Sequence, residues 1–405
     1  MSVPTRHPLS SGDTAVVVGM SGSTGLAVVR ALALGGVRCH AVHYDATTQA
    51  MATRLARPVL VPDWRSAPDA LVDFLVELAG ELGLAGEAAG AGAAAAASLF
   101  VCHDAALHVV WAAAARLLAA GLRPAFAARR PLADLLDKRV QLEAARAAGV
   151  DIPWSRWGAA AELVGHADEV PYPAIVKPAF SHLGVRELRA KALRCAGPDE
   201  LRAALARAAG IEVLVQEYVP GGDDQLYTAG VFVCADGHLA FTGRKLKQHP
   251  PGLGIARLAE AVDEPGLVPG SVALLRELGY EGVSQVEYKR DPRDGSFRLM
   301  EANFRPWTWV GLATACGVNL PLAAHRWALG DERWRDAAAV GDGPAAPPAD
   351  ARRSRTTPAR WVWAIPEARY TLRDLRHGVL PSPGQWRGLR AEAFFSRTDP
   401  APLLH

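Results

Sequence analysis

The sequence predicts a doubly wound α/β domain followed by a mixed α+β region. Over the first 118 residues, short β-branched runs alternate with helical patterns, as a parallel sheet with crossover helices requires. Between residues 172 and 303, strand patterns dominate and helices only punctuate them. A chain of 405 residues is also long enough for two or three domains.

The elements are expected in this order along the chain. In the first domain, strands are expected at 14–18, 37–43, 58–61 and 98–102, and helices at 25–34, 70–82 and 105–118. One helix is expected from Leu132 to Gly149, because apolar residues recur at helical spacing until Gly149 and Pro153 end it. The second region then has strands at 172–177, 213–218, 226–234, 238–246, 282–289 and 297–303, and helices at 199–209, 270–278 and 320–329.

The composition excludes several classes of protein. The formal net charge of +2 gives no general field for nucleic acid, and no apolar run approaches the length of a membrane span. The first 13 residues lack the apolar core of a signal peptide, and the five scattered cysteines contain no CxxC pair, so we expect a cytoplasmic protein with reduced thiols. Only six of the 44 basic residues are lysines, and all six lie between residues 138 and 289, which makes this stretch the first place to look for chemistry.

A glycine-rich turn joins the first expected strand to the first helix. Gly19, Gly22 and Gly25 lie in this turn, and Asp45 follows the second strand. The arrangement is close to a dinucleotide-binding fingerprint, but the spacing is GxxGxxG and not GxGxxG. A nicotinamide site and a purely structural turn both remain open at this point.

The strongest local pattern is an expected β-hairpin that carries acids on both strands. A turn centred near Asp294 puts Glu287 opposite Glu301, and Asn303 and Arg305 share the face of Glu301 by the two-residue period of a strand. Two facing carboxylates destabilise a hairpin unless a cation lies between them. Two acids and an amide oxygen are also typical ligands of Mg²⁺ that binds substrate phosphates, so the pattern favours a metal site over an exposed face.

Further cations lie on other expected strands. Lys177 ends an apolar strand, ahead of a loop that could close over a ligand. Lys245 and Lys247 share one strand face, with Arg244 on the other; a bound polyanion would relieve their repulsion, and so would surface exposure. The segment 214–224 runs from a buried strand into a glycine turn with paired acids, which suits an adenine edge and ribose hydroxyls.

Taken in order, these residues resemble the ATP-grasp superfamily, in particular the D-aspartate ligase-like group of its carboxylate-amine ligases. The resemblance covers residues 132–330 and rests on Lys138, Lys177-Pro178, Gln216-Glu217-Tyr218-Val219, Arg244-Lys245, Glu287 and Glu301-x-Asn303-x-Arg305. It implies two α+β subdomains that grip ATP, at 131–335, with a small lid subdomain at about 155–220. It also implies a Rossmann-like domain at 1–130, a linker at 336–358 and a C-terminal segment at 359–405 that packs on the body.

The resemblance implies a role for each matching residue. ATP would be bound by phosphate ligands, an adenine hinge and a ribose ligand, which are Lys138, Lys177, Ser181, Gln216, Glu217, Val219, and Asp223 or Asp224. Two Mg²⁺ ions would be held by Glu287, Glu301 and Asn303, and the transferring phosphoryl group would be stabilised by Arg305, Arg244 and Lys245. Substrate contacts are expected from Lys247, His249, Arg257 and Ser21.

Such a site implies an ATP-dependent ligase. It would phosphorylate a small-molecule carboxylate to an acyl phosphate and couple it to an amine, with release of ADP and phosphate, a chemistry that fits natural-product biosynthesis. The expected partners are these two substrates, with no nucleic acid and no membrane, and the expected state is a monomer or homodimer. Two other functions stay open, a nicotinamide-dependent oxidoreductase that uses the glycine turn and a non-catalytic ATP-binding protein.

Overall fold

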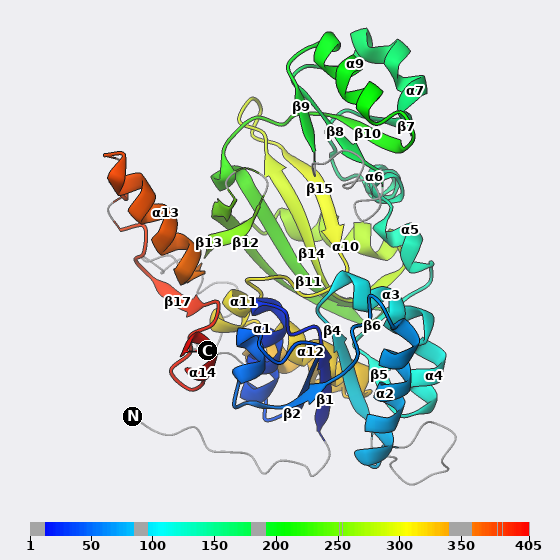
Figure 1. Cartoon of the computed structure of the whole chain (residues 1–405), viewed down its shortest axis with the longest axis vertical. Helices are drawn as coiled ribbons and strands as arrows, with labels where there is room; N and C mark the ends of the chain where they lie inside the picture. Colours follow the sequence, from blue (N-terminus) through cyan, green and yellow to red (C-terminus); the bar gives the residue numbers. More distant parts are fainter. Residues whose placement is uncertain are drawn as a thin grey trace.

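The computed structural model describes residues 13–84, 96–179, 192–250, 252, 254–339, 359–378, 380–382 and 384–404. Three sheets follow one another along the long axis of the molecule, with the N-terminal sheet at one end, the large sheet in the middle and a small sheet at the other end (Figure 1). Among the described helices, none is long and apolar enough to cross a membrane.

The N-terminal domain is a five-stranded parallel sheet, which confirms the expected doubly wound domain. Its strand order is β3-β2-β1-β4-β5, with helices in the crossovers. The elements are β1 (Thr14–Val18), α1 (Ser23–Leu34), β2 (Arg38–His43), η1 (Gln49–Ala52), β3 (Ala56–Leu60), α2 (Pro68–Glu81), β4 (Ala97–Val101), α3 (Asp104–Ala112), α4 (Ala114–Ala119) and β5 (Leu122–Pro124). The single helix expected at 105–118 is wrong, because the chain leaves helical geometry at Ala113, between α3 and α4.

The small sheet is antiparallel and lies farthest from the N-terminal domain (Figure 1). Its order is β7-β10-β8-β9, and its helices pack on one face over a core that includes Val176, Leu201 and Val213. The elements are β7 (Ser155–Ala159), α7 (Ala160–Leu163), η2 (Val164–Glu169), β8 (Ala174–Pro178), β9 (Leu193–Cys195), α9 (Pro198–Arg207) and β10 (Glu212–Glu217).

The large sheet has eight strands in the order β15-β14-β11-β12-β13-β16-β17, with β6 paired to β14. Helix α10 packs in the core on one face, while α11 and α12 share the other core with α1 of the N-terminal domain. The elements are β6 (Phe126–Ala128), α5 (Leu132–Leu136), α6 (Lys138–Ala147), η3 (Asp223–Gln225), β11 (Leu226–Cys234), β12 (Gly237–His249), β13 (Ile255–Ala261), α10 (Leu267–Glu277), β14 (Tyr280–Arg290), β15 (Phe297–Asn303), α11 (Gly311–Ala315), α12 (Leu320–Ala328), η4 (Glu332–Ala339), β16 (Arg360–Val362), α13 (Ala364–Arg376), β17 (Leu389–Glu392) and α14 (Ala401–Leu404).

Two glycines in neighbouring strands of the large sheet make room for two tryptophans. A Cβ at Gly230 would lie 2.1 Å from the Trp307 ring, and one at Gly243 would lie 2.7 Å from the Trp309 ring. The two indoles meet edge to face, with ring centroids 5.8 Å apart. The chain that follows the acid hairpin is therefore fixed on the sheet by packing of bulky rings against bare backbone.

The helix expected from Leu132 to Gly149 is also wrong, because it is two helices that meet at Asp137. The Asp137 side chain accepts a hydrogen bond from the Arg139 backbone N–H at 2.8 Å and so caps the second helix, α6. An aspartate is a better cap than an interior helical residue, which explains the break. The break makes Lys138 the first residue of α6.

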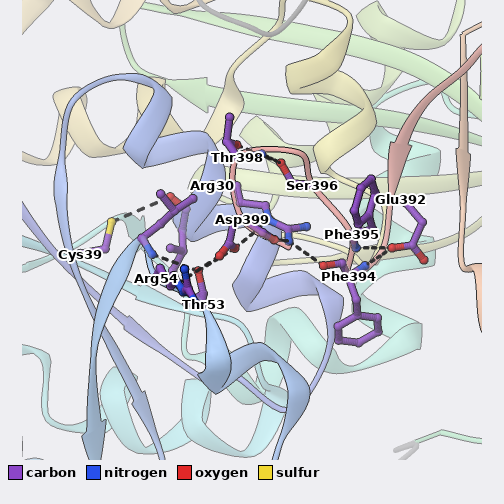
Figure 2. A network of polar contacts seen from close by, with 12 residues as sticks. Arg30, Cys39, Thr53, Arg54, Glu392, Phe394, Phe395, Ser396, Thr398 and Asp399 are labelled. Atoms are coloured by element: carbon purple, nitrogen blue, oxygen red, sulfur yellow. Dashed lines mark hydrogen bonds and ion pairs between the residues drawn. The ribbon is translucent and has the colours of Figure 1, made fainter. Parts of the chain in front are cut away.

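The C-terminal segment packs on both large domains. Strand β16 adds to the large sheet beside β13, and the last residues pack on the N-terminal domain through Asp399 (Figure 2). The Asp399 carboxylate accepts from Arg30 Nε at 3.2 Å and Thr53 Oγ1 at 2.8 Å, while Arg30 Nη2 donates to the Phe394 carbonyl at 2.7 Å. Of the linker expected at 336–358, η4 reaches Ala339, and residues 340–358 lie outside the described residues.

Candidate active site

The expected acid hairpin is formed by β14 and β15. Glu287 lies directly opposite Glu301, and Gln285 lies opposite Asn303, which confirms the predicted pairing. The pairing holds because of a β-bulge: residues 290 and 297 pair next to the turn, and β15 carries one extra residue before Glu301. The predicted convergence of two carboxylates and an amide is therefore present on one face of the large sheet.

A lysine provides the cation that two facing carboxylates require. Lys245 Nζ, from β12, lies 2.7 Å from Glu287 Oε1, and both side chains are almost buried. The same Glu287 oxygen accepts from Gln285 Nε2 at 2.9 Å. A metal ion is thus not needed to explain why the hairpin tolerates its acids, although an ion could still bind there.

Glu301 is surrounded by lysines from three separate elements. Burial raises the pKa of the Glu301 carboxyl, but the charges of Lys138, Lys177 and Lys245, with a hydrogen bond to Asn303, outweigh it and lower the pKa below its usual value. These lysines come from α6, β8 and β12. The fold therefore gathers ammonium groups from all parts of the 131–335 region around one carboxylate.

Lys177 is a buried ammonium group with other lysines nearby. Burial, together with the neighbouring charges of Lys138 and Lys289, lowers the pKa of the Lys177 ammonium from 10.5 to about 8, although Glu301 acts in the opposite direction. Its Nζ donates to Gln216 Oε1 at 3.1 Å, and Gln216 in turn donates to Ser155 Oγ at 3.0 Å. An anionic ligand at Lys177 would offset both the burial of this charge and the repulsion from the other lysines.

Residues 216–224, expected to hold adenine and ribose, lie at the end of β10, in the loop that follows it and at the start of η3. Glu217 accepts from Arg293 Nη2 at 2.5 Å, which ties β10 to the turn of the acid hairpin, while Val219 is buried. Asp223 accepts two hydrogen bonds from Gln248, each 2.8 Å long, from its backbone N–H and its Nε2. Asp224 accepts only a 3.3 Å bond from Gln225 among the described hydrogen bonds, which favours it over Asp223 as the ribose ligand.

Arg305 connects the acid hairpin to the N-terminal domain. Its guanidinium forms an ion pair with Asp104, the first residue of α3, and Nη2 lies 3.0 Å from Asp104 Oδ2. Glu301 is close enough to raise the pKa of Arg305, together with Asp104, although burial opposes this. Arg305 therefore lies near Glu301, and Asp104 already balances much of its charge.

Arg244 does not join this group. Successive side chains of a strand point to opposite faces of a sheet. Because Lys245 points toward Glu287, its neighbour Arg244 lies on the opposite face of the large sheet. There its Nη2 lies 2.6 Å from Glu260 Oε1, and Arg360 contacts the other oxygen at 3.0 Å. The expected role of Arg244 at the transferring phosphoryl group is incompatible with this position.

The expected substrate ligands and the remaining expected ATP ligand, Ser181, fall in three places. Lys247, His249 and Arg257 come together under α13, where Lys247 and Arg257 both contact Glu367. Ser21 is exposed in the glycine turn between β1 and α1. Ser181 and the rest of the expected phosphate-covering loop lie outside the described residues.

No model of a known protein family matches this chain. Among curated proteins, D-aspartate ligase from Enterococcus faecium (strain Aus0004) is 29% identical over 170 residues, which are 38% of this chain and 40% of that protein. The match therefore spans less than half the length of this relative.

Solved structures extend the likeness over most of the chain. An L-amino acid ligase from Bacillus licheniformis superimposes with a TM-score of 0.56 at 14% identity, covering 78% of this chain and 74% of that chain. A biotin carboxylase complexed with βγ-ATP, from Campylobacter jejuni, gives a TM-score of 0.60 at 16% identity, covering 79% and 71%. The chain has the ATP-grasp fold. The expected fold class is thereby confirmed.

The donors of this ATP-grasp chain suit magnesium. Glu287, Glu301 and Asn303 offer two carboxylates and an amide oxygen, and Mg²⁺ is commonly held by one or two carboxylates together with substrate phosphates. Among the described residues, no group of three or more His, Cys, Asp or Glu side chains could hold an ion without such help. Two carboxylates and an amide oxygen are nonetheless hard ligands of the kind that Mg²⁺ takes.

The glycine turn of this ATP-grasp chain has a structural explanation. Gly19 has a φ of +99°, and a Cβ there would lie 3.0 Å from His103. A Cβ at Gly25 would lie 2.7 Å from Met20 Sδ. Ser23 Oγ donates to the Thr308 carbonyl at 2.9 Å, so the turn packs against the chain beside the acid hairpin. Close packing accounts for Gly19 and Gly25 without a dinucleotide.

Sequence reasoning missed one residue that shapes the site. Gln141 of α6 is buried; its Nε2 donates to the Ala302 carbonyl at 3.1 Å, and its Oε1 accepts from the Ala302 N–H at 2.9 Å. Because β15 is an edge strand, the Gln141 amide pairs with it as another strand would, between Glu301 and Asn303. Only the helical period of α6, which points Gln141 inward, hints at this role in the sequence.

Proposed function

We propose that this chain is an ATP-dependent carboxylate-amine ligase. The observation that carries the proposal is the convergence of Lys138, Lys177 and Lys245 on Glu301, with the pKa of Lys177 lowered to about 8. Ammonium groups in excess over carboxylates form a site for a polyanion such as the triphosphate of ATP. The ATP-grasp fold and the partial match to D-aspartate ligase support this choice of anion and of chemistry.

Each residue has a part in the proposed reaction. Lys138 and Lys177 bind the phosphates of ATP, the 216–219 segment holds the adenine, and Asp224 holds the ribose. Glu287, Glu301 and Asn303 would hold two Mg²⁺ ions, which would neutralise the charge of the phosphates. Lys245 and Arg305 stabilise the oxygens of the γ-phosphoryl group as it moves to a substrate carboxylate.

The products follow from this transfer. The carboxylate oxygen attacks the γ-phosphorus, the bond to the β-phosphate oxygen breaks, and ADP leaves. An amine then attacks the acyl carbon, the bond from that carbon to the phosphate oxygen breaks, and phosphate leaves. The nitrogen loses a proton, and the amide is formed. The first steps need positioning and charge neutralisation and no covalent protein nucleophile.

The test of this proposal is a screen of carboxylate and amine pairs with Mg²⁺ and ATP. Turnover should yield ADP and phosphate in equal amounts, together with an amide product identified by mass spectrometry. AMP and pyrophosphate would contradict the proposal. Binding of Mg·ATP without turnover on any pair would favour the non-catalytic ATP-binding protein, and a tight complex with NAD without affinity for ATP would favour the oxidoreductase.

A further inference from the structure

A cluster of buried charges lies where the C-terminal segment covers the ends of β12 and β13. Lys247 comes from β12, Arg257 from β13 and Glu367 from α13. The side chains of Arg257 and Glu367 are only 7% and 4% exposed. The amide of Gln385 and the ring of Tyr370, also from the C-terminal segment, complete the cluster.

The contacts within this cluster leave its cations incompletely paired. Glu367 Oε1 lies 3.1 Å from Lys247 Nζ, and Glu367 Oε2 lies 3.3 Å from Arg257 Nη1. Lys247 also donates to Gln385 Oε1 at 2.8 Å, and the Arg257 guanidinium lies 4.3 Å from the centroid of the Tyr370 ring. One carboxylate is therefore shared between two cations.

Two buried donors of the cluster have no acceptor. Among the described residues, Arg257 Nε and Gln385 Nε2 are buried without a hydrogen-bond partner, while Arg257 Nη1 and Glu367 Oε2 lie 3.3 Å apart as an ion pair without a hydrogen bond. Glu260, three residues along β13, cannot supply the missing charge, because it is already shared by Arg244 and Arg360. Two cations that share one carboxylate, with buried donors left unpaired beside them, are stabilised when an anion joins them.

We propose that this cluster is a second anion site, which binds a carboxylate that does not react. The inference rests on the proposed function, in which Lys245 stabilises the phosphoryl group as it moves to the reacting carboxylate. Lys247 is two residues further along the same strand, so a group held by Lys247 and Arg257 lies next to the phosphoryl-transfer site without occupying it. Two anion sites require that the substrate pair carries a second carboxylate, which does not react.

The proposal defines the class of substrate. Either the amine substrate is an amino acid, whose own carboxylate binds at Arg257, or the acid substrate is a dicarboxylate. It also makes the C-terminal segment part of the substrate site, through Gln385 and Glu367. Glu367 holds Arg257 and Lys247 in place, and its negative charge weakens the attraction of both for a ligand carboxylate.

The first experiment measures binding by thermal shift with Mg²⁺ and a non-hydrolysable ATP analogue. The probes are the proteinogenic amino acids in both configurations, succinate and glutarate, each compared with its methyl ester, which lacks the charged carboxylate. Free acids should raise the Tm and their esters should not. A comparison of the Tm shifts with amino acids and with dicarboxylates shows which of these two classes supplies the bound carboxylate. If no free acid stabilises the protein more than its ester does, the proposal is wrong.

Variants of the cluster give the sharper test. Arg257→Ala should weaken binding of the stabilising acid about tenfold to a hundredfold, as expected for loss of a charge-assisted hydrogen bond. Gln385→Ala should weaken it less. Glu367→Gln should tighten it, because the variant keeps the side-chain shape and removes a competing negative charge. A purely structural Glu367 would instead weaken binding when changed, and that result would overturn the proposal.

Controls separate this inference from the proposed function. Arg369→Ala and Asp374→Asn change exposed or partly exposed charges on the same helix, α13, and should leave binding of the acid unchanged. Each variant should still show the full thermal shift with Mg·ATP alone, which also reports that it is folded. If Mg·ATP does not raise the Tm of the wild type, the proposed function is contradicted. An intact ATP response with an acid response that Arg257→Ala does not alter would contradict the second anion site only.

Discussion

Lys177→Met should make the protein more stable at neutral pH while it weakens the binding of ATP. The pKa of Lys177 is lowered from 10.5 to about 8 by burial and by Lys138 and Lys289, so the charged form of this group lowers the free energy of unfolding. Each unit of pKa corresponds to about 1.4 kcal/mol, and the lowering of about 2.5 units therefore costs about 3 kcal/mol. Methionine occupies a similar volume without the charge and should recover much of this energy.

The sign of the pH dependence follows from proton linkage. Below pH 8, Lys177 is charged in both the folded and the unfolded protein, and the full cost is present. Between pH 8 and 10.5 the unfolded state binds more protons, so the stability of the wild type rises with pH. The gain from Lys177→Met should therefore shrink from about 3 kcal/mol at pH 7 to about 1.4 kcal/mol at pH 9.5.

The assay is hydrogen exchange of the β8 and β10 amides at both pH values, because these strands carry Lys177 and its partner Gln216 and report the small sheet separately from the other domains. Lys177→Arg keeps the charge and serves as the matched control, with no gain in stability. In the wild type, the Kd for Mg·ATP should rise above pH 8 as Lys177 loses its proton. A Lys177→Met variant that is less stable at pH 7, or a gain that does not fall with pH, would refute this reasoning.

Three further changes test how the site is held. Gln141→Leu should cost about 1–3 kcal/mol by leaving the Ala302 backbone groups without partners, and should slow ATP turnover because β15 carries Glu301 and Asn303; exchange of the Ala302 amide and the turnover rate measure both effects. Asp399→Ala should cost about 3–5 kcal/mol, since it leaves Arg30 without its buried carboxylate, and limited proteolysis should then cut the C-terminal segment; an unchanged cleavage rate would contradict this. Gly230→Val should destabilise by more than about 1–3 kcal/mol, because its Cβ would meet the Trp307 ring at 2.1 Å, and an unaltered denaturation midpoint would contradict the packing described above.

The parts of the fold that follow local patterns could be predicted from the sequence. The strands of the first domain lie close to their expected bounds. Glu287 and Glu301 face each other as expected, although a β-bulge that the sequence did not indicate sets this register. Strand β13 was missed because it is buried along most of its length and shows no polar alternation. Helix α13 was missed as well, since it packs on the body mainly through Glu367 and neighbouring residues rather than through an apolar face.

The candidate site was predictable in its residue types and less so in its pairings. Lys138, Lys177 and Lys245 could be selected because lysine is rare in this chain, and the structure gathers all three at Glu301. The sequence could not show that Lys245 pairs with Glu287 or that Arg244 pairs with Glu260, because both pairs join residues 16 or more positions apart. For the same reason the contact of Glu367 with Arg257, across 110 positions, had no local signal.

The most direct test of the central claim is the product analysis of ATP turnover by the wild type and by Glu301→Ala, with Mg²⁺ and an active substrate pair. Glu301 is the carboxylate on which the three lysines converge, so its loss should abolish turnover, while the wild type should release ADP and phosphate in step with the amide. Formation of AMP and pyrophosphate, or full turnover by Glu301→Ala, would contradict the account of this site.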